Sequence, residues 1–312
     1  MSLDTSFDIK NIICSFFYDL KDTINLYNLN KDHHDNIRIT NLCDIKKNIR
    51  KLSQQIIEQN KYKYVEKLCT FDNKQIKSVN HIKNTLKILN CMYENKIDQK
   101  GISQLNLVEL NASYNKQINN VNHMKNTLKI LNCSYGSKID QKGISQLNLV
   151  ELKASNNKKI KNVNHMKNTL KILHCCDYCG IDQNGISQLN LVKLKVRDNK
   201  QIKNVNHMKE TLKILYCGYK CGIDQNGISE LNLIKLNVTG NEKIENVNHM
   251  KNTLKILDCC NESGIDQNGI SELNLIELDA YGNKKIKNVN HMKNTLILYD
   301  IYYSFKSYDL RE

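Results

Sequence analysis

The sequence predicts an α/β solenoid in which short parallel strands stack into one inner sheet. Two observations lead to this prediction. A unit of 21 residues recurs from Val65 to about Leu296, and each unit opens with a short segment in which apolar and other residues alternate. Alternation of this kind is typical of a strand with one buried face. A fixed period of this length is the signature of stacked structural repeats.

The apolar positions of the unit predict its core. A second Leu follows the first apolar residue after three positions, from Leu68 to Leu278, and an Ile follows it after eleven, from Ile76 to Ile286. Because one unit cannot bury its apolar side alone, we expect neighbouring units to stack and close a continuous core. The first apolar residues are Val65, Leu86, Leu107, Leu128, Leu149, Leu170, Leu191, Leu212, Leu233, Leu254, Leu275 and Leu296.

Two return segments alternate between successive units, so the full sequence period is 42 residues. The segment Val-Asn-His-Met-Lys-Asn-Thr predicts a single helical turn. The segment Asp-Gln-(Asn/Lys)-Gly-Ile-Ser contains a Gly that we expect to supply a positive φ. The His of the Val-Asn-His segment would recur about 10 Å apart, too far for neighbouring copies to share a metal ion, and is interpreted as scaffold. These histidines are His81, His123, His165, His207, His249 and His291.

An Asn recurs every 42 residues, eight positions after the first apolar residue of alternate units. An Asn side chain offers both donors and an acceptor, so we expect a buried ladder that bonds the turn backbone. Its members are Asn73, Asn115, Asn157, Asn199, Asn241 and Asn283.

Five of the 12 cysteines also recur every 42 residues, which predicts a role in the core. They are Cys91, Cys133, Cys175, Cys217 and Cys259. The pairs Cys176-x-x-Cys179 and Cys217-x-x-x-Cys221 have a zinc-like spacing, but neither has a matching second pair in its turn. We therefore expect no metal site and no cofactor.

The pattern L-x-x-L-x-(C/A/V/T)-x-x-(N/x)-x-x-I resembles the leucine-rich-repeat family over about three quarters of the chain. The resemblance implies a leucine-rich-repeat solenoid of about eleven 21-residue repeats with a parallel inner sheet. Because the Ile falls one residue later than in the usual family pattern, we expect a looser bend after each strand. The resemblance also implies that the variable strand residues face the concave side and its rim.

Residues 1–63 do not repeat. Their apolar spacing predicts two short amphipathic helices between Phe7 and Lys31, and a third over about Asp44–Gln59. The first part, with its Ile-x-x-x-Phe helix and Asp-Thr-x-x-Leu turn, resembles an F-box. The whole chain resembles the F-box/leucine-rich-repeat proteins of amoeba-infecting giant viruses. The expected divisions are an F-box-like segment (1–43), a helical linker or cap (44–63), the solenoid (64–298) and a C-terminal cap or tail (299–312).

The F-box resemblance implies a partner, a Skp1-type adaptor of a cullin ubiquitin ligase, and a role as substrate receptor. The residues expected to bind the adaptor are Ile13, Phe16, Phe17, Leu26 and Leu29. The alternative is a plain binding scaffold without a ligase link, in which the same segment is the N-terminal cap that an open solenoid needs.

Copies of the repeat differ at the outward strand positions and just after them, whereas the return segments are nearly identical. The sequence therefore predicts a target-binding surface rich in the residue types that anchor protein interfaces. The predicted target-binding residues are Tyr114, Tyr135, His174, Arg197, Tyr216, Tyr219, Asp258 and Tyr281.

Charge and composition limit the other classes of function. The net charge of +14 arises mostly from one duplicated Lys-rich phrase, so we do not expect a nucleic-acid partner. The apolar runs are too short to span a bilayer, and no signal peptide is evident. We expect a protein of the host cytoplasm, without a membrane partner. No catalytic constellation stands out from the repeat, so an enzyme is not expected.

Overall fold

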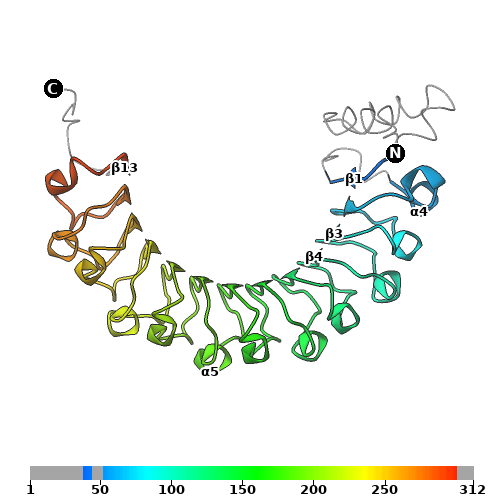
Figure 1. The fold of residues 1–312 in the computed structure, drawn as a ribbon, viewed down its shortest axis with the longest axis horizontal. Coiled ribbons are helices and arrows are strands. Elements are labelled where there is room, and N and C mark those ends of the chain that lie inside the picture. Colours follow the sequence, from blue (N-terminus) through cyan, green and yellow to red (C-terminus); the bar gives the residue numbers. More distant parts are fainter. Residues whose placement is uncertain (1–37, 44–51, 301–312) are drawn as a thin grey trace, which may run out of the picture. The chain divides into compact units, whose positions relative to one another are not determined.

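The computed structural model describes residues 38–43 and 52–300, and the chain divides into two compact units, 1–149 and 150–312. In each unit, taken by itself, parallel strands follow one another in sequence order, on the inner side of a curved array of repeats (Figure 1). The predicted leucine-rich-repeat solenoid is confirmed in both units. The residues expected to bind an adaptor lie outside the described residues.

In the first unit the strands pair in the order β1 to β5. Its strands are β1 (Asn41–Leu42), β2 (Lys67–Cys69), β3 (Ile88–Asn90), β4 (Glu109–Asn111) and β5 (Ile130–Asn132). Its helices are α4 (Gln54–Ile57) and the 3₁₀ turns η2 (Asn60–Tyr62), η3 (Asn80–Ile82), η4 (Lys100–Ile102), η5 (Asn122–Met124) and η6 (Lys142–Ile144).

The second unit continues the same pattern, from β6 to β13. Its strands are β6 (Glu151–Lys153), β7 (Ile172–His174), β8 (Lys193–Lys195), β9 (Ile214–Tyr216), β10 (Lys235–Asn237), β11 (Ile256–Asp258), β12 (Glu277–Asp279) and β13 (Leu298–Asp300). Its helices are α5 (Gln183–Ile186) and the 3₁₀ turns η7 (Asn164–Met166), η8 (Asn206–Met208), η9 (Asn226–Ile228), η10 (Asn248–Met250), η11 (Asn268–Ile270) and η12 (Asn290–Met292).

The N-terminal part of the described chain differs from the helical prediction in two places. The third helix was expected over about Asp44–Gln59, but α4 ends at Ile57 and a 3₁₀ turn follows. Asn41–Leu42, within the expected F-box-like segment, forms β1 and pairs with β2. Ser53 caps α4, because its hydroxyl accepts a hydrogen bond from the Ile56 amide.

Each strand is three residues long in the repeats, and its middle residue is the second Leu of the unit. In β6, Leu152 is fully buried, while Glu151 and Lys153 on either side are half-buried. The Ile after the bend is also buried in every repeat, from Ile76 to Ile286. The predicted core and its register are therefore confirmed, and the five periodic cysteines lie in that core without exposed surface.

The return segments are short helical turns of two kinds. The Val-Asn-His segment forms a 3₁₀ turn, as predicted, in each described copy from η3 to η12. The expected positive φ of the Gly in the second segment is wrong. Gly185 has an ordinary φ, and its position is crowded instead: a Cβ there would collide with the carbonyl oxygen of Lys161 in the preceding repeat. The close approach of two backbones, not the φ angle, requires this Gly.

Apart from that of Gly136, the positive φ angles of the described residues occur at the bend after each strand, seven residues beyond the first apolar position. In the eleven repeats from β2 to β12 the residues there are Asp72, Tyr93, Tyr114, Tyr135, Asn156, Asp177, Asp198, Tyr219, Gly240, Asn261 and Gly282. Gly, Asn and Asp tolerate this left-handed conformation, whereas a bulky residue such as Tyr is uncommon in it. The bend is therefore fixed by backbone geometry that the sequence pattern did not reveal.

The predicted Asn ladder is confirmed, and it joins neighbouring repeats. The Asn199 amide donates to the carbonyl oxygens of Cys175 and Ile181, each at 3.0 Å. Its oxygen accepts from the Gln201 amide at 2.9 Å. Asn115, Asn241 and Asn283 make the corresponding pair of bonds. The ladder is structural, since it satisfies carbonyl groups that would otherwise be buried without a partner.

Candidate functional site

The outward face of the sheet, here called the strand face, consists of the first and third residues of each strand. The strands pair in register, so residues at equivalent positions form rows that run across the strands. In the second unit, the third-residue row reads Lys153, His174, Lys195, Tyr216, Asn237, Asp258 and Asp279. The row contains three of the predicted target-binding residues, which the stacking of repeats brings side by side.

Tyr216 is the centre of a basic region on β8 to β10. The Nζ atoms of Lys195, Lys193 and Lys235 lie 4.5, 5.9 and 6.0 Å from the centroid of its ring. Ammonium groups within about 6 Å of an aromatic ring are attracted by its negative face. The ring therefore holds three cations on a half-buried surface. The sequence prediction included Tyr216 but none of these lysines.

His174 lies in the same row, between Lys153 and Lys195. Its Nε2 atom is buried and has no hydrogen-bond partner among the described residues. Desolvation, reinforced by the charges of Lys195 and Lys153, lowers the pKa of His174 to about 4. The imidazole is consequently neutral at neutral pH, mainly because burial disfavours its charged form.

The other end of the row is acidic. Asp258 accepts hydrogen bonds from the Asn237 amide and from the Thr239 hydroxyl, the latter at 2.6 Å. The Cys260 thiol donates to an Asp279 carboxylate oxygen at 2.7 Å. Burial and the two carboxylates raise the pKa of Cys260, so its sulfur remains a thiol. Ligand atoms of Asp258, Cys260 and Asp279 lie within 4.8 Å of one another, an arrangement explained by these hydrogen bonds.

Aromatic rings stack along the bend of the first unit. Tyr93 and Tyr114 have ring centroids 4.8 Å apart, and Tyr114 and Tyr135 have centroids 5.2 Å apart. Phe71 meets Tyr93 edge-on at 4.9 Å. The sequence prediction included Tyr114 and Tyr135 but neither Tyr93, which occupies the equivalent position of the preceding repeat, nor Phe71, which lies one position earlier in its repeat.

The remaining predicted residues lie near the bend of the second unit. Arg197 stands over the ring of Tyr219, with the guanidinium carbon 4.3 Å from the centroid. Tyr281 is exposed at the equivalent position of a later repeat. The predicted set therefore divides between the two units: Tyr114 and Tyr135 belong to the first, and the other six residues to the second.

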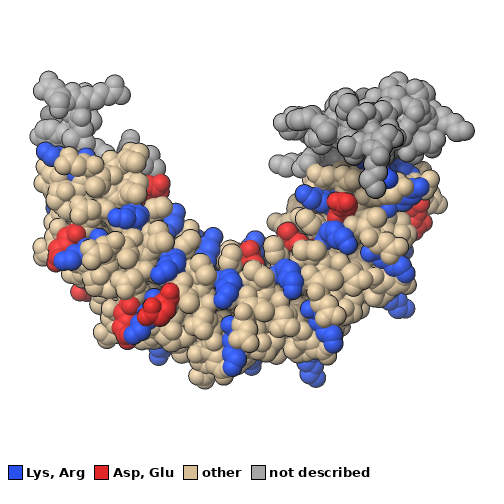
Figure 2. Space-filling view, viewed as in Figure 1, with Lys and Arg blue, Asp and Glu red and all other residues tan. Residues whose placement is uncertain are grey.

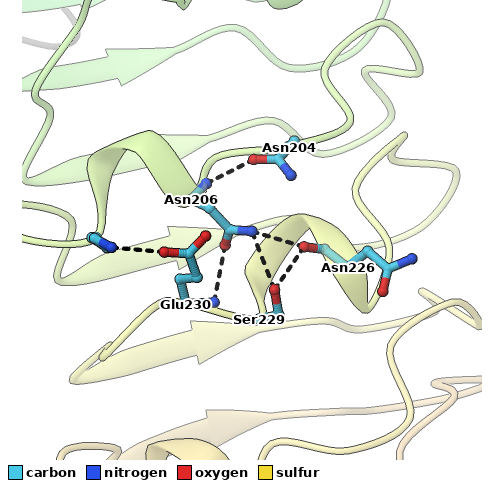
Figure 3. A network of polar contacts seen from close by, with 6 residues as sticks. Asn204, Asn206, Asn226, Ser229 and Glu230 are labelled. Carbon is cyan, nitrogen blue, oxygen red and sulfur yellow. Dashed lines mark hydrogen bonds and ion pairs between the residues drawn. The ribbon is translucent and has the colours of Figure 1, made fainter.

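The return segments are held by bonds between repeats. The Asn206 amide donates to the Asn226 carbonyl at 2.8 Å and to the Ser229 hydroxyl at 3.3 Å (Figure 3). The Asn206 oxygen accepts from the Glu230 amide at 3.1 Å. Asn122, Asn164 and Asn248 donate to the equivalent carbonyls. These hydrogen bonds give the near-identity of the exposed return-segment residues a structural cause.

The periodic histidines have the same kind of role. The Nε2 atoms of His123, His207 and His249 lie 3.0, 3.2 and 3.2 Å from carbonyl oxygens of the preceding repeat. Desolvation lowers the pKa of each of these three histidines. The interpretation of the His series as scaffold agrees with these contacts. Lysines are spread over the outer surface of both units (Figure 2).

No protein-family model matches the sequence, and no curated protein matches it. An internalin, InlF, from Listeria monocytogenes has a similar solved structure, with a TM-score of 0.50 and 16% identity over 86% of this chain and 79% of that chain. The structure of the Rad7 and Elc1 complex in yeast matches with a TM-score of 0.46 and 17% identity over 94% and 92% of the two chains. InlJ of Listeria monocytogenes, whose functional domain includes a cysteine ladder, has a TM-score of 0.45 and 19% identity over 79% and 59%. At these identities the comparison with InlF supports the repeat fold alone.

Proposed function

We propose that this protein is a protein-interaction module, and that its strand face binds a protein target. The observation that supports the proposal is the row of seven half-exposed or exposed side chains across β6 to β12, which changes from basic through aromatic to acidic. Aromatic and Arg residues are the usual anchors of protein interfaces. The repeats hold them on a rigid, hydrogen-bonded framework, so little entropy is lost when a partner binds.

The finer proposal is that the chain is the substrate receptor of an SCF-type (Skp1-cullin-F-box) ubiquitin ligase. Its support is the F-box-like sequence of residues 7–31, where Ile13, Phe16, Phe17, Leu26 and Leu29 would form an apolar face for the adaptor. A segment of this length cannot bury such a face by itself. No enzymatic activity and no cofactor belong to this proposal.

A double variant distinguishes the receptor from the plain scaffold. In a receptor, Phe17→Ala with Leu26→Ala abolishes co-purification with a Skp1-type adaptor and leaves the thermal stability of the repeats nearly unchanged. In a scaffold, where the segment is a cap, the same variant lowers the free energy of unfolding by about 2–5 kcal/mol, as core truncations do. Intact protein that fails to bind the adaptor at micromolar concentration removes the ligase proposal.

Target binding is tested separately, on the predicted residues of the strand face and the bends. Alanine at Tyr114, Tyr135, Arg197, Tyr216 and Tyr219 should abolish capture of the cellular partner without changing the circular-dichroism spectrum. The matched control replaces return-segment lysines, Lys125, Lys167 and Lys251, which lie on the 3₁₀ side of the repeats. Loss of capture in the control alone would place the site on that basic surface.

A further inference from the structure

The charge of the strand face in the second unit is segregated along the sheet. On β6 to β10 the outward strand residues include four lysines, Lys153, Lys193, Lys195 and Lys235, against one carboxylate, Glu151. On β11 and β12 they include Asp258, Glu277 and Asp279 and no basic residue. Duplication by itself copies the charge of the founder unit into every repeat. A strand position that is basic in some repeats and acidic in others therefore changed after duplication.

The lysines around Tyr216 lack local neutralisation. Lys193, Lys195 and Lys235 form no ion pair with a carboxylate among the described residues; each is placed against the Tyr216 ring. The buried, unpartnered Nε2 of His174 adjoins the same region. Cations held on a half-buried surface interact more strongly with an anion than exposed cations do, because less solvent screens them.

Apolar side chains separate these cations. In the first-residue row, Ile172, Lys193, Ile214 and Lys235 follow one another on paired strands β7 to β10. Strands lie about 4.8 Å apart, so successive cations of the row are about 10 Å apart. That distance corresponds to about three residues of a polyproline-II chain, one full turn, which returns every third side chain to the same face. One phosphate cannot bridge that distance, whereas carboxylates spaced along a peptide can.

We propose that the strand face of β6 to β10 binds an acidic segment of a partner protein, with carboxylates about three residues apart and apolar residues between them, centred on Tyr216. The proposal rests on the proposed function and specifies the chemistry of the target. The curvature of the unit places the strands on its inner side (Figure 1), so the same face of a second copy fits poorly there and an extended segment fits well.

The test uses full-length protein and a fluorescein-labelled peptide, four copies of Glu-Leu-Gly, with binding followed by fluorescence anisotropy. The proposal expects binding that weakens with added salt, and at least tenfold weaker binding of the Gln-Leu-Gly peptide. Lys195→Gln with Lys235→Gln should weaken binding at least fivefold. Tyr216→Ala should weaken it, whereas Tyr216→Phe should restore it, since the ring and not the hydroxyl faces the lysines.

The matched control is Lys167→Gln with Lys251→Gln, which removes the same charge from 3₁₀ turns of the same unit. Equal loss of binding in the control would mean that net charge alone attracts the peptide, and would overturn the proposal. An oligouridine is the second ligand tested. If it binds more tightly than the acidic peptide, and if this binding depends on Lys195 and Lys235, the proposal is overturned in favour of nucleic acid. If the acidic peptide does not bind while the alanine variants of the tyrosines and of Arg197 still abolish target capture, the further inference is wrong and the proposed function stands.

Discussion

At the scale of single residues, the second return segment contains a Gly that we expect to stabilise the fold, whereas a Gly within a helix is ordinarily destabilising. Gly185 lies in α5, where replacing Gly by Ala ordinarily stabilises by about 1 kcal/mol. Here the added Cβ would collide with the Lys161 carbonyl oxygen. We expect Gly185→Ala to lower the free energy of unfolding by about 1–3 kcal/mol, measured by urea denaturation. Asn184→Ala, at the exposed neighbouring position, should change it by less than about 0.5 kcal/mol.

Leu152 tests the register of the repeat. It is fully buried at the centre of β6, among apolar side chains that offer a carboxylate no partner. We expect Leu152→Asp to cost several kcal/mol and to unfold the repeats around it, because an unpaired charge is placed in the core. A circular-dichroism melt indistinguishable from that of the unchanged protein would contradict the register. Lys153→Asp, one residue further on the half-exposed face, is the matched control and should fold.

At the scale of elements, the bend after every second strand depends on one side chain of the Asn ladder. Asn199→Ala removes two donors from the carbonyls of Cys175 and Ile181 and one acceptor from the Gln201 amide. Buried groups left without partners cost about 1–3 kcal/mol. We therefore expect a loss of that order in the free energy of unfolding.

The control for the ladder is Asn204→Ala, which removes a single exposed hydrogen bond to the Asn206 amide. Its effect in the same urea titration should be clearly smaller. Equal effects of the two substitutions would show that burial of the Asn ladder contributes nothing beyond one ordinary hydrogen bond.

At the scale of the whole molecule, three of the periodic histidines, His123, His207 and His249, make stability depend on pH. Burial lowers the pKa of each in the folded state, so the unfolded chain binds protons first as the pH falls below about 6.5. The contribution of these histidines to the free energy of unfolding is present above that pH. It is lost as the pH falls towards their pKa in the folded state. We expect the melting temperature to drop between pH 7 and pH 5.

The variant that checks this prediction replaces His123, His207 and His249 with Gln, whose amide can donate to the same carbonyls. The melting temperature of the variant should depend less on pH between 7 and 5 than that of the unchanged protein. An unchanged slope would mean that other groups cause the pH dependence. Within the described ranges, none of the helices has the length and apolarity that a membrane span requires.

Four features could be predicted from the sequence: the 21-residue period, the register of the strands, the buried Leu, Ile and Cys positions, and the Asn ladder. Each of these follows from local alternation of apolar and other residues and from the need of one repeat to bury its face on the next. Tyr216 and His174 could be found in the same way, because they vary between copies at an outward position.

The contacts between side chains of neighbouring repeats could not be predicted from the sequence. The collision that requires Gly185, the carbonyl partners of the histidines and the three lysines around Tyr216 all join residues about 20 or more positions apart in the chain. Stacking brings such residues within a few ångströms, and the energy of their contacts depends on that distance. A periodic pattern places residues in equivalent rows, but the contacts between rows are fixed by the packing of one repeat on the next.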